Sequence, residues 1–122
     1  MKSIPSGAMM MNYKELAEFS KEFKHLSKKY YSLDKDFALF KKLLESELLG
    51  TRKHFNVLTI AGEIKIVKAR LFCQTLRGSS LRVIYSYNGA EIEFIEFIEL
   101  YFKGNKEAED KERIKEYLKN IN

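Results

Sequence analysis

The amino-acid sequence predicts an α+β domain in which an N-terminal helical hairpin and a C-terminal helix pack on a small antiparallel β-sheet. Three observations support this class. Apolar residues recur at helical spacing between residues 19 and 48, apolar and polar residues alternate between residues 63 and 87, and Asn88-Gly89 is a strong signal for a tight hairpin turn. A chain of 122 residues that is 45% apolar can bury one sizeable core. We therefore expect a disordered leader over residues 1–10 and a single domain over residues 11–122.

Two helices are expected after a short possible first strand in the segment MMMNYKEL. The first has a lysine-rich face and an apolar stripe of residues spaced four, three and four apart: Phe19, Phe23, Leu26 and Tyr30. Ser20 is in position to cap its start. Ser32 and Asp34 interrupt that period and can cap a second helix, which Gly50 ends. The buried stripe of the second helix is Phe37, Phe40, Leu43, Leu44 and Leu48.

Three strands and a last helix are expected in the second half of the chain, after a loop-like segment over residues 51–62. Core-facing positions alternate along the first two strands: Val67, Ala69, Leu71 and Cys73, then Leu81, Val83, Tyr85 and Tyr87. Residues 91–102 are rich in Ile, Phe and Tyr, which favours a third strand over a helix, with a bulge or two apolar faces. The last helix begins near Asn105 and has the stripe Ile114, Tyr117, Leu118 and Ile121. We expect the helices to back one face of the sheet and to leave its other face free.

Charge and cysteine content limit the class of protein. The formal net charge is +5, and residues 91–122 hold six Lys or Arg against nine Asp or Glu, so the first 90 residues carry 16 against eight. This basic excess suits an anionic partner. A single cysteine excludes an intrachain disulfide and indicates a reducing, cytoplasmic location. With two histidines we expect no metal site and no cofactor, and the start of the chain has no apolar run of signal or membrane length.

Three cations occupy the non-core positions of two neighbouring strands. Lys68, Arg70 and Arg82 share one side of the expected sheet, and this arrangement forms a basic surface if the register brings them together. Arginine holds two phosphate oxygens at once, and lysine can move a proton if neighbouring cations lower its pKa. RNA cleavage by attack of a 2′-hydroxyl needs a base, cations around the phosphorane-like transition state, and an acid. The alternative is that these cations form ion pairs with glutamates of the third strand: Glu91, Glu93, Glu96 and Glu99.

Five segments, taken in order, resemble the RelE/ParE superfamily of type II toxin–antitoxin toxins. They are FSKEFKHLSKKY from Phe19, KAR at Lys68, LRVIY at Leu81, ELYFKGNK at Glu99, and EDKERIKEYL from Glu109. The resemblance covers residues from about 11 to the C-terminus. It implies a sheet with an N-terminal helical hairpin and, in the RelE branch, ribosome-dependent cleavage of mRNA by cations in place of histidines.

The resemblance also implies roles for individual residues. The expected catalytic set is Lys68, Arg70, Arg82, Lys103 and Lys106, and the expected substrate-binding set is Lys65, Arg77 and Tyr101. The chain departs from RelE at Ile66, where RelE has a lysine, and it has Asp110 and Lys111 near the place of a RelE tyrosine. The resemblance thus predicts a toxin that is an mRNA endoribonuclease without a metal or cofactor. Its partners are a cognate antitoxin and mRNA on the ribosome, with contacts to ribosomal RNA and none to a membrane.

Two other functions stay open on the sequence alone. A ParE-like toxin binds DNA gyrase without cutting RNA, and in such a protein the cations only position a partner. A basic binding module derived from this fold has no enzymatic chemistry. Induction of the three kinds of protein has different consequences: cut mRNA, damaged DNA with intact message, or no growth defect.

Overall fold

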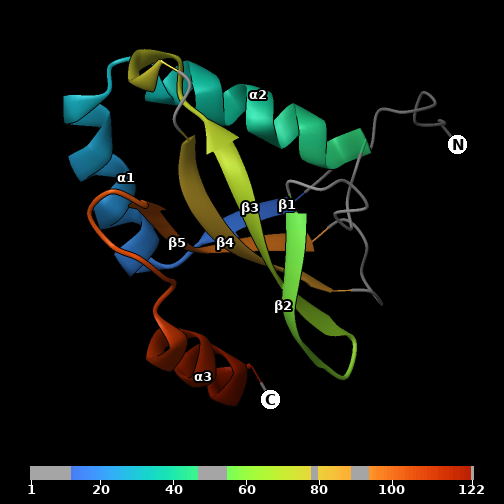
Figure 1. Cartoon of the computed structure of the whole chain (residues 1–122). Helices are drawn as coiled ribbons and strands as arrows, with labels where there is room; N and C mark the ends of the chain where they lie inside the picture. The colour runs from blue at the N-terminus through green and yellow to red at the C-terminus, as the bar shows by residue number, and fades with distance from the viewer. Residues whose placement is uncertain (1–11, 47–54, 78–79, 89–93, 122) are drawn as a thin grey trace, which may run out of the picture.

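The computed structural model describes residues 12–46, 55–77, 80–88 and 94–121. Three helices and five strands are arranged along the chain, as Figure 1 shows. They are β1 (Asn12–Glu15), α1 (Ala17–Lys29), α2 (Leu33–Ser46), β2 (Phe55–Ala61), β3 (Ile64–Phe72), a 3-10 turn (Gln74–Leu76), β4 (Ser80–Asn88), β5 (Phe94–Phe102) and α3 (Lys111–Asn120). The α+β class is therefore confirmed. The expected leader, Leu48, Gly50, Gly89, Glu91 and Glu93 lie outside the described residues.

The five strands form one mixed sheet in the order β1-β5-β4-β3-β2. Four neighbouring strands run antiparallel, whereas β1 pairs in parallel with β5, from Asn12 opposite Phe94 to Glu15 opposite Phe97. The prediction of a purely antiparallel sheet was therefore wrong. The sequence places β1 and β5 some 80 positions apart, so no local turn signal fixes their relative direction.

Residues 55–61 form β2, although the sequence indicated a loop there. Ala61 pairs with Ile64, so two residues, Gly62 and Glu63, make the turn into β3. Gly62 has φ +63, the left-handed conformation that glycine adopts without strain and that two-residue hairpin turns require. Gly62-Glu63 is therefore the sequence feature that could have indicated a hairpin and the additional antiparallel strand β2.

The helical hairpin lies on one face of the sheet. Its core contains Phe19, Phe37 and Leu44 from the helices, packed against the predicted inward positions of β3 and β4. The stripes predicted for both helices are thus confirmed in the described residues, except that Leu43 is 37% exposed. Ser20 does not cap α1, because the helix begins at Ala17 after the extended residue Leu16, and the Ser20 hydroxyl donates instead to the Glu15 carboxylate.

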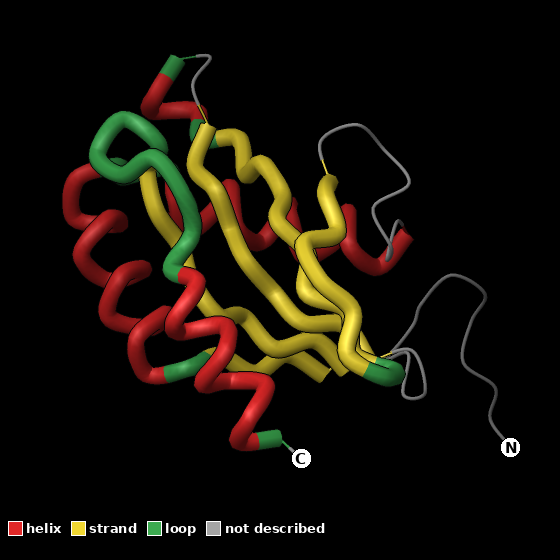
Figure 2. The backbone as a smooth tube through the Cα atoms, turned by 60° about the horizontal axis from the view of Figure 1, so that its bottom comes forward, coloured by secondary structure: helices red, strands yellow, loops and turns green. Residues whose placement is uncertain are grey.

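The C-terminal helix α3 covers part of the opposite face, which we had expected to be free. Ile114 and Tyr117 of α3 pack on Ile66, Ile84 and Ile98, the apolar outward positions of three strands. In Figure 2, α3 crosses the sheet on the side away from α2. The domain therefore has a second, smaller core, because outward isoleucines on three adjacent strands are stabilised only when something covers them.

Strand β5 has a bulge and a capped edge. Ile84 pairs with Glu99 and Tyr85 with Phe97, so Ile98 is the extra residue, which confirms the predicted bulge. Beyond the end of β1, the Leu100 N–H donates to Glu22 (3.0 Å) and the Ile98 carbonyl accepts from Arg113 (2.9 Å). Side chains thus form hydrogen bonds with backbone groups of β5 that have no partner strand at this point of the described sheet. No helix in the described ranges is long and apolar enough to cross a membrane.

Candidate nucleic-acid interface

The register of the sheet brings the predicted cations together. Arg70 on β3 lies directly opposite Arg82 on β4, and Arg82 lies directly opposite Tyr101 on β5. In the next row Lys68 follows on the same side, opposite Ile84. Lys68, Arg70 and Arg82, which we call the cationic cluster, therefore occupy neighbouring positions on the face that α3 partly covers.

Two arginines directly opposite one another are unfavourable for folding. Like charges at cross-strand positions repel, whereas opposite charges there stabilise a sheet by about 0.2–1 kcal/mol. Arg70 is exposed, and neither a hydrogen bond nor an ion pair to its guanidinium is found among the described residues. Arg82 is half-buried and contributes to the electrostatic environment of Tyr101. An anion bound between the two guanidinium groups would reduce this repulsion.

Lys68 is paired with a carboxylate that the sequence did not indicate. Its ammonium donates to Glu109 over 2.9 Å, and the two side chains are only 26% and 11% exposed. Burial lowers the pKa of Lys68, but the hydrogen bond to Glu109, the charges of Tyr101 and Glu109, and the proximity of the Tyr101 hydroxyl raise it, so the net pKa lies above its ordinary value. Lys68 therefore stays protonated at neutral pH and supplies positive charge. It does not fit the role of a proton-accepting base, which requires a lowered pKa.

The Tyr101 hydroxyl is buried close to the Lys68 ammonium, although it makes no hydrogen bond of ordinary length and angle among the described residues. The residue is 6% exposed. Burial is the main cause of its raised pKa, which Glu109 and Glu99 raise further and which Lys68 and Arg82 lower in part. The phenol thus keeps its proton at neutral pH beside the cationic cluster.

A buried carboxylate, Glu99, anchors the segment between β5 and α3. Glu99 is 0% exposed and accepts hydrogen bonds from the Asp110 N–H (2.8 Å) and from the Lys106 ammonium. The Lys106 ammonium also lies 5.4 Å from the centre of the Tyr101 ring, which is a cation–π distance. Asp110 in turn caps α3 by accepting from the Arg113 N–H (3.0 Å). These contacts fix residues 99–110 against the face that carries the cationic cluster.

The remaining predicted residues take different places. Lys106 lies beside Tyr101 but is paired with Glu99, and Lys103 is exposed in the turn after β5. Lys65 has the opposite parity to Lys68 on β3, so it lies on the face of the helical hairpin and apart from the cationic cluster. Arg77 is exposed at the end of the 3-10 turn with φ 52. The structure therefore groups Lys68, Arg70, Arg82, Tyr101 and Lys106, and it separates Lys65 from them.

Among the glutamates proposed as alternative partners, Glu96 and Glu99 hold other groups, whereas Glu91 and Glu93 lie outside the described residues. Glu96 accepts from the Tyr117 hydroxyl (3.1 Å), and Glu99 holds Lys106 and Asp110. The carboxylate that pairs with Lys68 is Glu109, which stands outside any strand. Sequence reasoning missed it because it lies 41 positions from Lys68 in a segment without periodicity.

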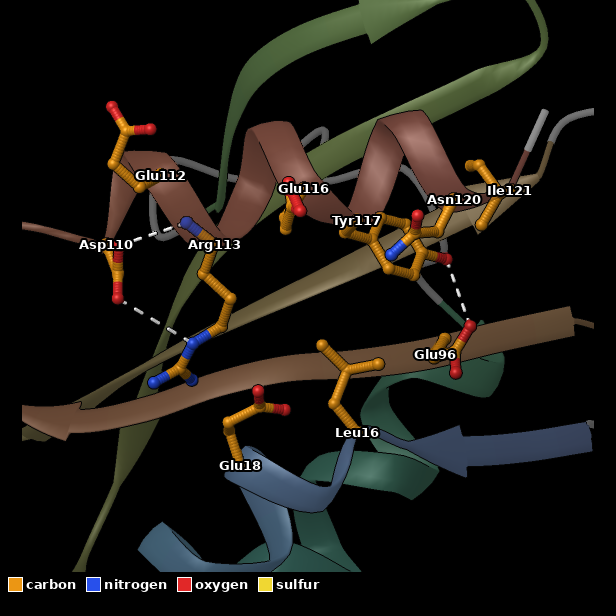
Figure 3. Close-up of a pocket in the computed structure, with 10 residues that line it drawn as sticks. All are labelled: Leu16, Glu18, Glu96, Asp110, Glu112, Arg113, Glu116, Tyr117, Asn120 and Ile121. Atoms are coloured by element: carbon orange, nitrogen blue, oxygen red, sulfur yellow. Dashed lines mark hydrogen bonds and ion pairs between the residues drawn. The ribbon is translucent and has the colours of Figure 1, made fainter.

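Among the grooves formed by the described residues, one lies apart from the cationic cluster and another has Arg70 of the cluster in its lining. The first, of about 520 Å³, runs between α3 and the start of α1 and is shown in Figure 3. Its charged lining is five carboxylates and one arginine: Glu18, Glu96, Asp110, Glu112, Glu116 and Arg113. Among the described side chains no three potential ligands are grouped closely enough to hold a metal ion. The second groove, of about 320 Å³, is mainly apolar and has Arg70 and Phe72 at its side.

Comparisons with protein-family models, with curated proteins and with solved structures found no match to this chain. The likeness to the RelE/ParE superfamily therefore remains a resemblance of the five sequence segments quoted above. Function has to be inferred from the chemistry of the cationic cluster and its neighbours.

Proposed function

We propose that this chain is the toxin of a type II toxin–antitoxin system and that it cleaves mRNA on the ribosome without a metal ion. One observation carries the proposal. The two directly opposed arginines, Arg70 and Arg82, stand on neighbouring strands beside a protonated lysine, Lys68. Such a set of donors matches a phosphodiester, which offers several acceptor oxygens and a negative charge.

The cluster also fits the charge that develops during cleavage. When a 2′-hydroxyl attacks the neighbouring phosphorus, negative charge grows on the non-bridging oxygens of a phosphorane-like transition state. Arg70 and Arg82 hold those oxygens, and Lys68 adds a third positive charge. Because these groups sit on β-strands, their positions are fixed before the substrate arrives, and this preorganisation is the main source of electrostatic catalysis.

The cations farther from the cluster have a binding role. Lys103 and Arg77 are exposed, and the lysines of α1 cover a solvated helix face. These residues contact the backbone of the message and ribosomal RNA, where they add affinity that depends on salt concentration. Lys106 acts through the Tyr101 ring and does not contact the phosphate.

A protein that cuts mRNA needs an inhibitor in the cell that makes it. We propose a small acidic or amphipathic antitoxin that adds a helix or strand to the domain and shields the cationic cluster. Its negative groups would take the place of the phosphate between the opposed arginines. A short reading frame next to the gene, whose product restores growth, is the expected finding.

The test is induction of wild type, Arg82→Ala and Lys115→Ala in cells, with growth and primer extension on a translated message as readouts. Lys115→Ala is a matched control because this substitution also removes one cation, but from an exposed position on α3. Wild type and the control should stop growth and cut the message, and Arg82→Ala should do neither. Intact message with damaged DNA would support a gyrase-binding toxin, and no growth defect would support a non-catalytic binding module.

A further inference from the structure

Exposed aromatic side chains gather at one end of the molecule. Among the described residues the exposed aromatic ones are Tyr31 and Phe72, with exposed fractions of 86% and 59%, and the other phenylalanines and tyrosines are buried or half-buried. Tyr31 lies in the connection between α1 and α2, and Phe72 is the last residue of β3. In Figure 1 this connection lies beside the 3-10 turn that follows β3. Both exposed rings therefore belong to the same end of the sheet.

Hydrogen bonds tie the connection between the helices to the 3-10 turn. The Ser32 N–H donates to the Thr75 hydroxyl over 3.1 Å, and the Thr75 N–H donates to the Ser32 hydroxyl over 3.0 Å. The Asp36 carboxylate accepts from the Ser32 hydroxyl (2.7 Å) and from the Gln74 N–H (2.9 Å). Tyr31 directly precedes Ser32, so a well-fixed backbone carries a ring that packs on very little of the protein.

Positive charge surrounds the two rings. Residues 28–36 and 70–77 carry five Lys or Arg, all exposed, against two Asp. One of the aspartates, Asp36, is already an acceptor for two protein donors. The exposed cations are Lys28, Lys29, Lys35, Arg70 and Arg77. Together with Tyr31 and Phe72 they form a basic and aromatic area, which we call the tip surface.

The tip surface continues the cationic cluster. Arg70 belongs to both, and Phe72 follows it on the same side of β3, because side chains two residues apart in a strand point the same way. Cys73 comes next, and its sulfur lies 3.7 Å from the Ser32 hydroxyl. A strand rises about 3.3 Å per residue, so about 10 Å of chain leads from Arg70 to this contact. An extended anionic polymer bound at the cluster can therefore reach Tyr31.

This composition fits single-stranded nucleic acid better than a protein segment. Unpaired bases stack on exposed aromatic rings while cations follow the phosphates. Phe72 and Arg70 also border the apolar groove of about 320 Å³, so a base stacked on Phe72 is partly shielded from water. Tyr31 is not among the described residues that line this groove, so an apolar protein segment seated there would leave the more exposed ring uncovered. A polymer with both bases and charges covers both rings.

On the basis of the function proposed above, we infer that the tip surface binds single-stranded message next to the scissile phosphate. One unpaired base stacks on Phe72 and another on Tyr31, while Arg77 and the lysines of the helical hairpin hold the neighbouring phosphates. The surface selects single strands, because the bases of a duplex are already stacked and paired. It binds the message and takes no part in bond breaking.

The first experiment uses fluorescence. The chain has no tryptophan, so Tyr31→Trp introduces a single indole at the tip surface. The purified variant is titrated at low salt with a hexamer of uridines and with an abasic hexamer that has the same phosphates and no bases. Ile60→Trp is the matched control, because Ile60 is 60% exposed on β2, outside the tip surface. We expect the uridines to quench Tyr31→Trp, the abasic hexamer to leave it nearly unchanged, and neither to affect Ile60→Trp.

The second experiment measures affinity by anisotropy of labelled hexamers. Tyr31→Ala should bind the uridine hexamer about 10-fold more weakly than wild type, since one stacking contact is lost, and Tyr31→Phe should stay within about twofold because it keeps the ring. Phe72→Ala and Phe72→Tyr should behave in the same two ways. The abasic hexamer should bind wild type and all four variants equally, with an affinity that falls as salt rises.

Equal quenching of Tyr31→Trp by both hexamers, or no quenching by either, would overturn the inference. So would an equal loss of affinity for both hexamers in Tyr31→Ala. If the co-expressed antitoxin quenches the indole and the hexamers do not, the tip surface binds protein and the inference is wrong. Cleavage is tested separately by Arg82→Ala in cells. Base-dependent quenching in a protein that cuts no message would support the tip surface and refute the nuclease.

Discussion

Replacement of Arg70 by methionine should make the protein more stable and less active. Methionine keeps an unbranched stem that can cover the same neighbours, and it removes the charge that faces Arg82. Arg70 is exposed and Arg82 half-buried, so the dielectric constant of water applies. With an assumed charge separation of about 8 Å, Coulomb's law gives a repulsion of about 0.5 kcal/mol. A change of that size raises the melting temperature by about 2 °C in a domain of this length.

The assay is thermal and urea unfolding of wild type and Arg70→Met in 10 mM and in 1 M salt. The screening length falls from about 30 Å to about 3 Å between these conditions, so the gain should be present in low salt and absent in high salt. Arg82→Met is the matched control, because Arg70→Met should give no gain in that background. Loss of stability in both salts, or the same gain with and without Arg82, would refute the claim that the two arginines repel each other. Cleavage should fall in either single variant.

Two further predictions concern buried polar groups. Glu99→Ala should lower the free energy of unfolding by about 2–3 kcal/mol, because the Asp110 N–H and the charged Lys106 ammonium lose their acceptor. The control is Glu112→Ala at an exposed position of α3, which should change the free energy of unfolding by less than about 0.5 kcal/mol. Urea unfolding measures both variants, and equal effects would contradict an anchoring role for Glu99. Burial raises the pKa of Tyr117 to about 12, so the folded state keeps a proton that the unfolded state loses near pH 10. The free energy of unfolding should therefore fall between about pH 10 and pH 12 in wild type, and fall less in Tyr117→Phe; an identical fall would show that other groups cause it.

The local pattern of the sequence predicted most of the elements. Alternation placed Val83, Tyr85 and Tyr87 of β4 in the interior, and all are buried. The same alternation put Arg82 on the other side, where it lies. These predictions succeeded because side-chain direction in a strand has a period of two that depends on the backbone alone. The β2 strand was missed because its turn signal, Gly62-Glu63, is weaker than Asn-Gly, although both permit the required backbone conformation.

Within the candidate site, the positions of the cations could be predicted and their partners could not. The pairing of Arg70 with Arg82 follows from two strands joined by a short connection, whose register is determined locally. The pairing of Lys68 with Glu109 depends on how the segment after β5 returns across the sheet. No periodicity in that segment indicates which of its carboxylates meets a lysine 41 positions earlier.

The sequence by itself determined which residues face which side of β3 and β4, and hence that three cations share one parity on these strands. Only the tertiary structure decided that α3 covers part of this face, that β1 runs parallel to β5, and that Tyr101 and Glu109 stand beside the cations. The physical reason is the range of the forces involved. Side-chain direction is a property of a few consecutive residues. Burial and charge pairing instead depend on which distant segments pack on the same surface, and this is determined only when the whole chain folds.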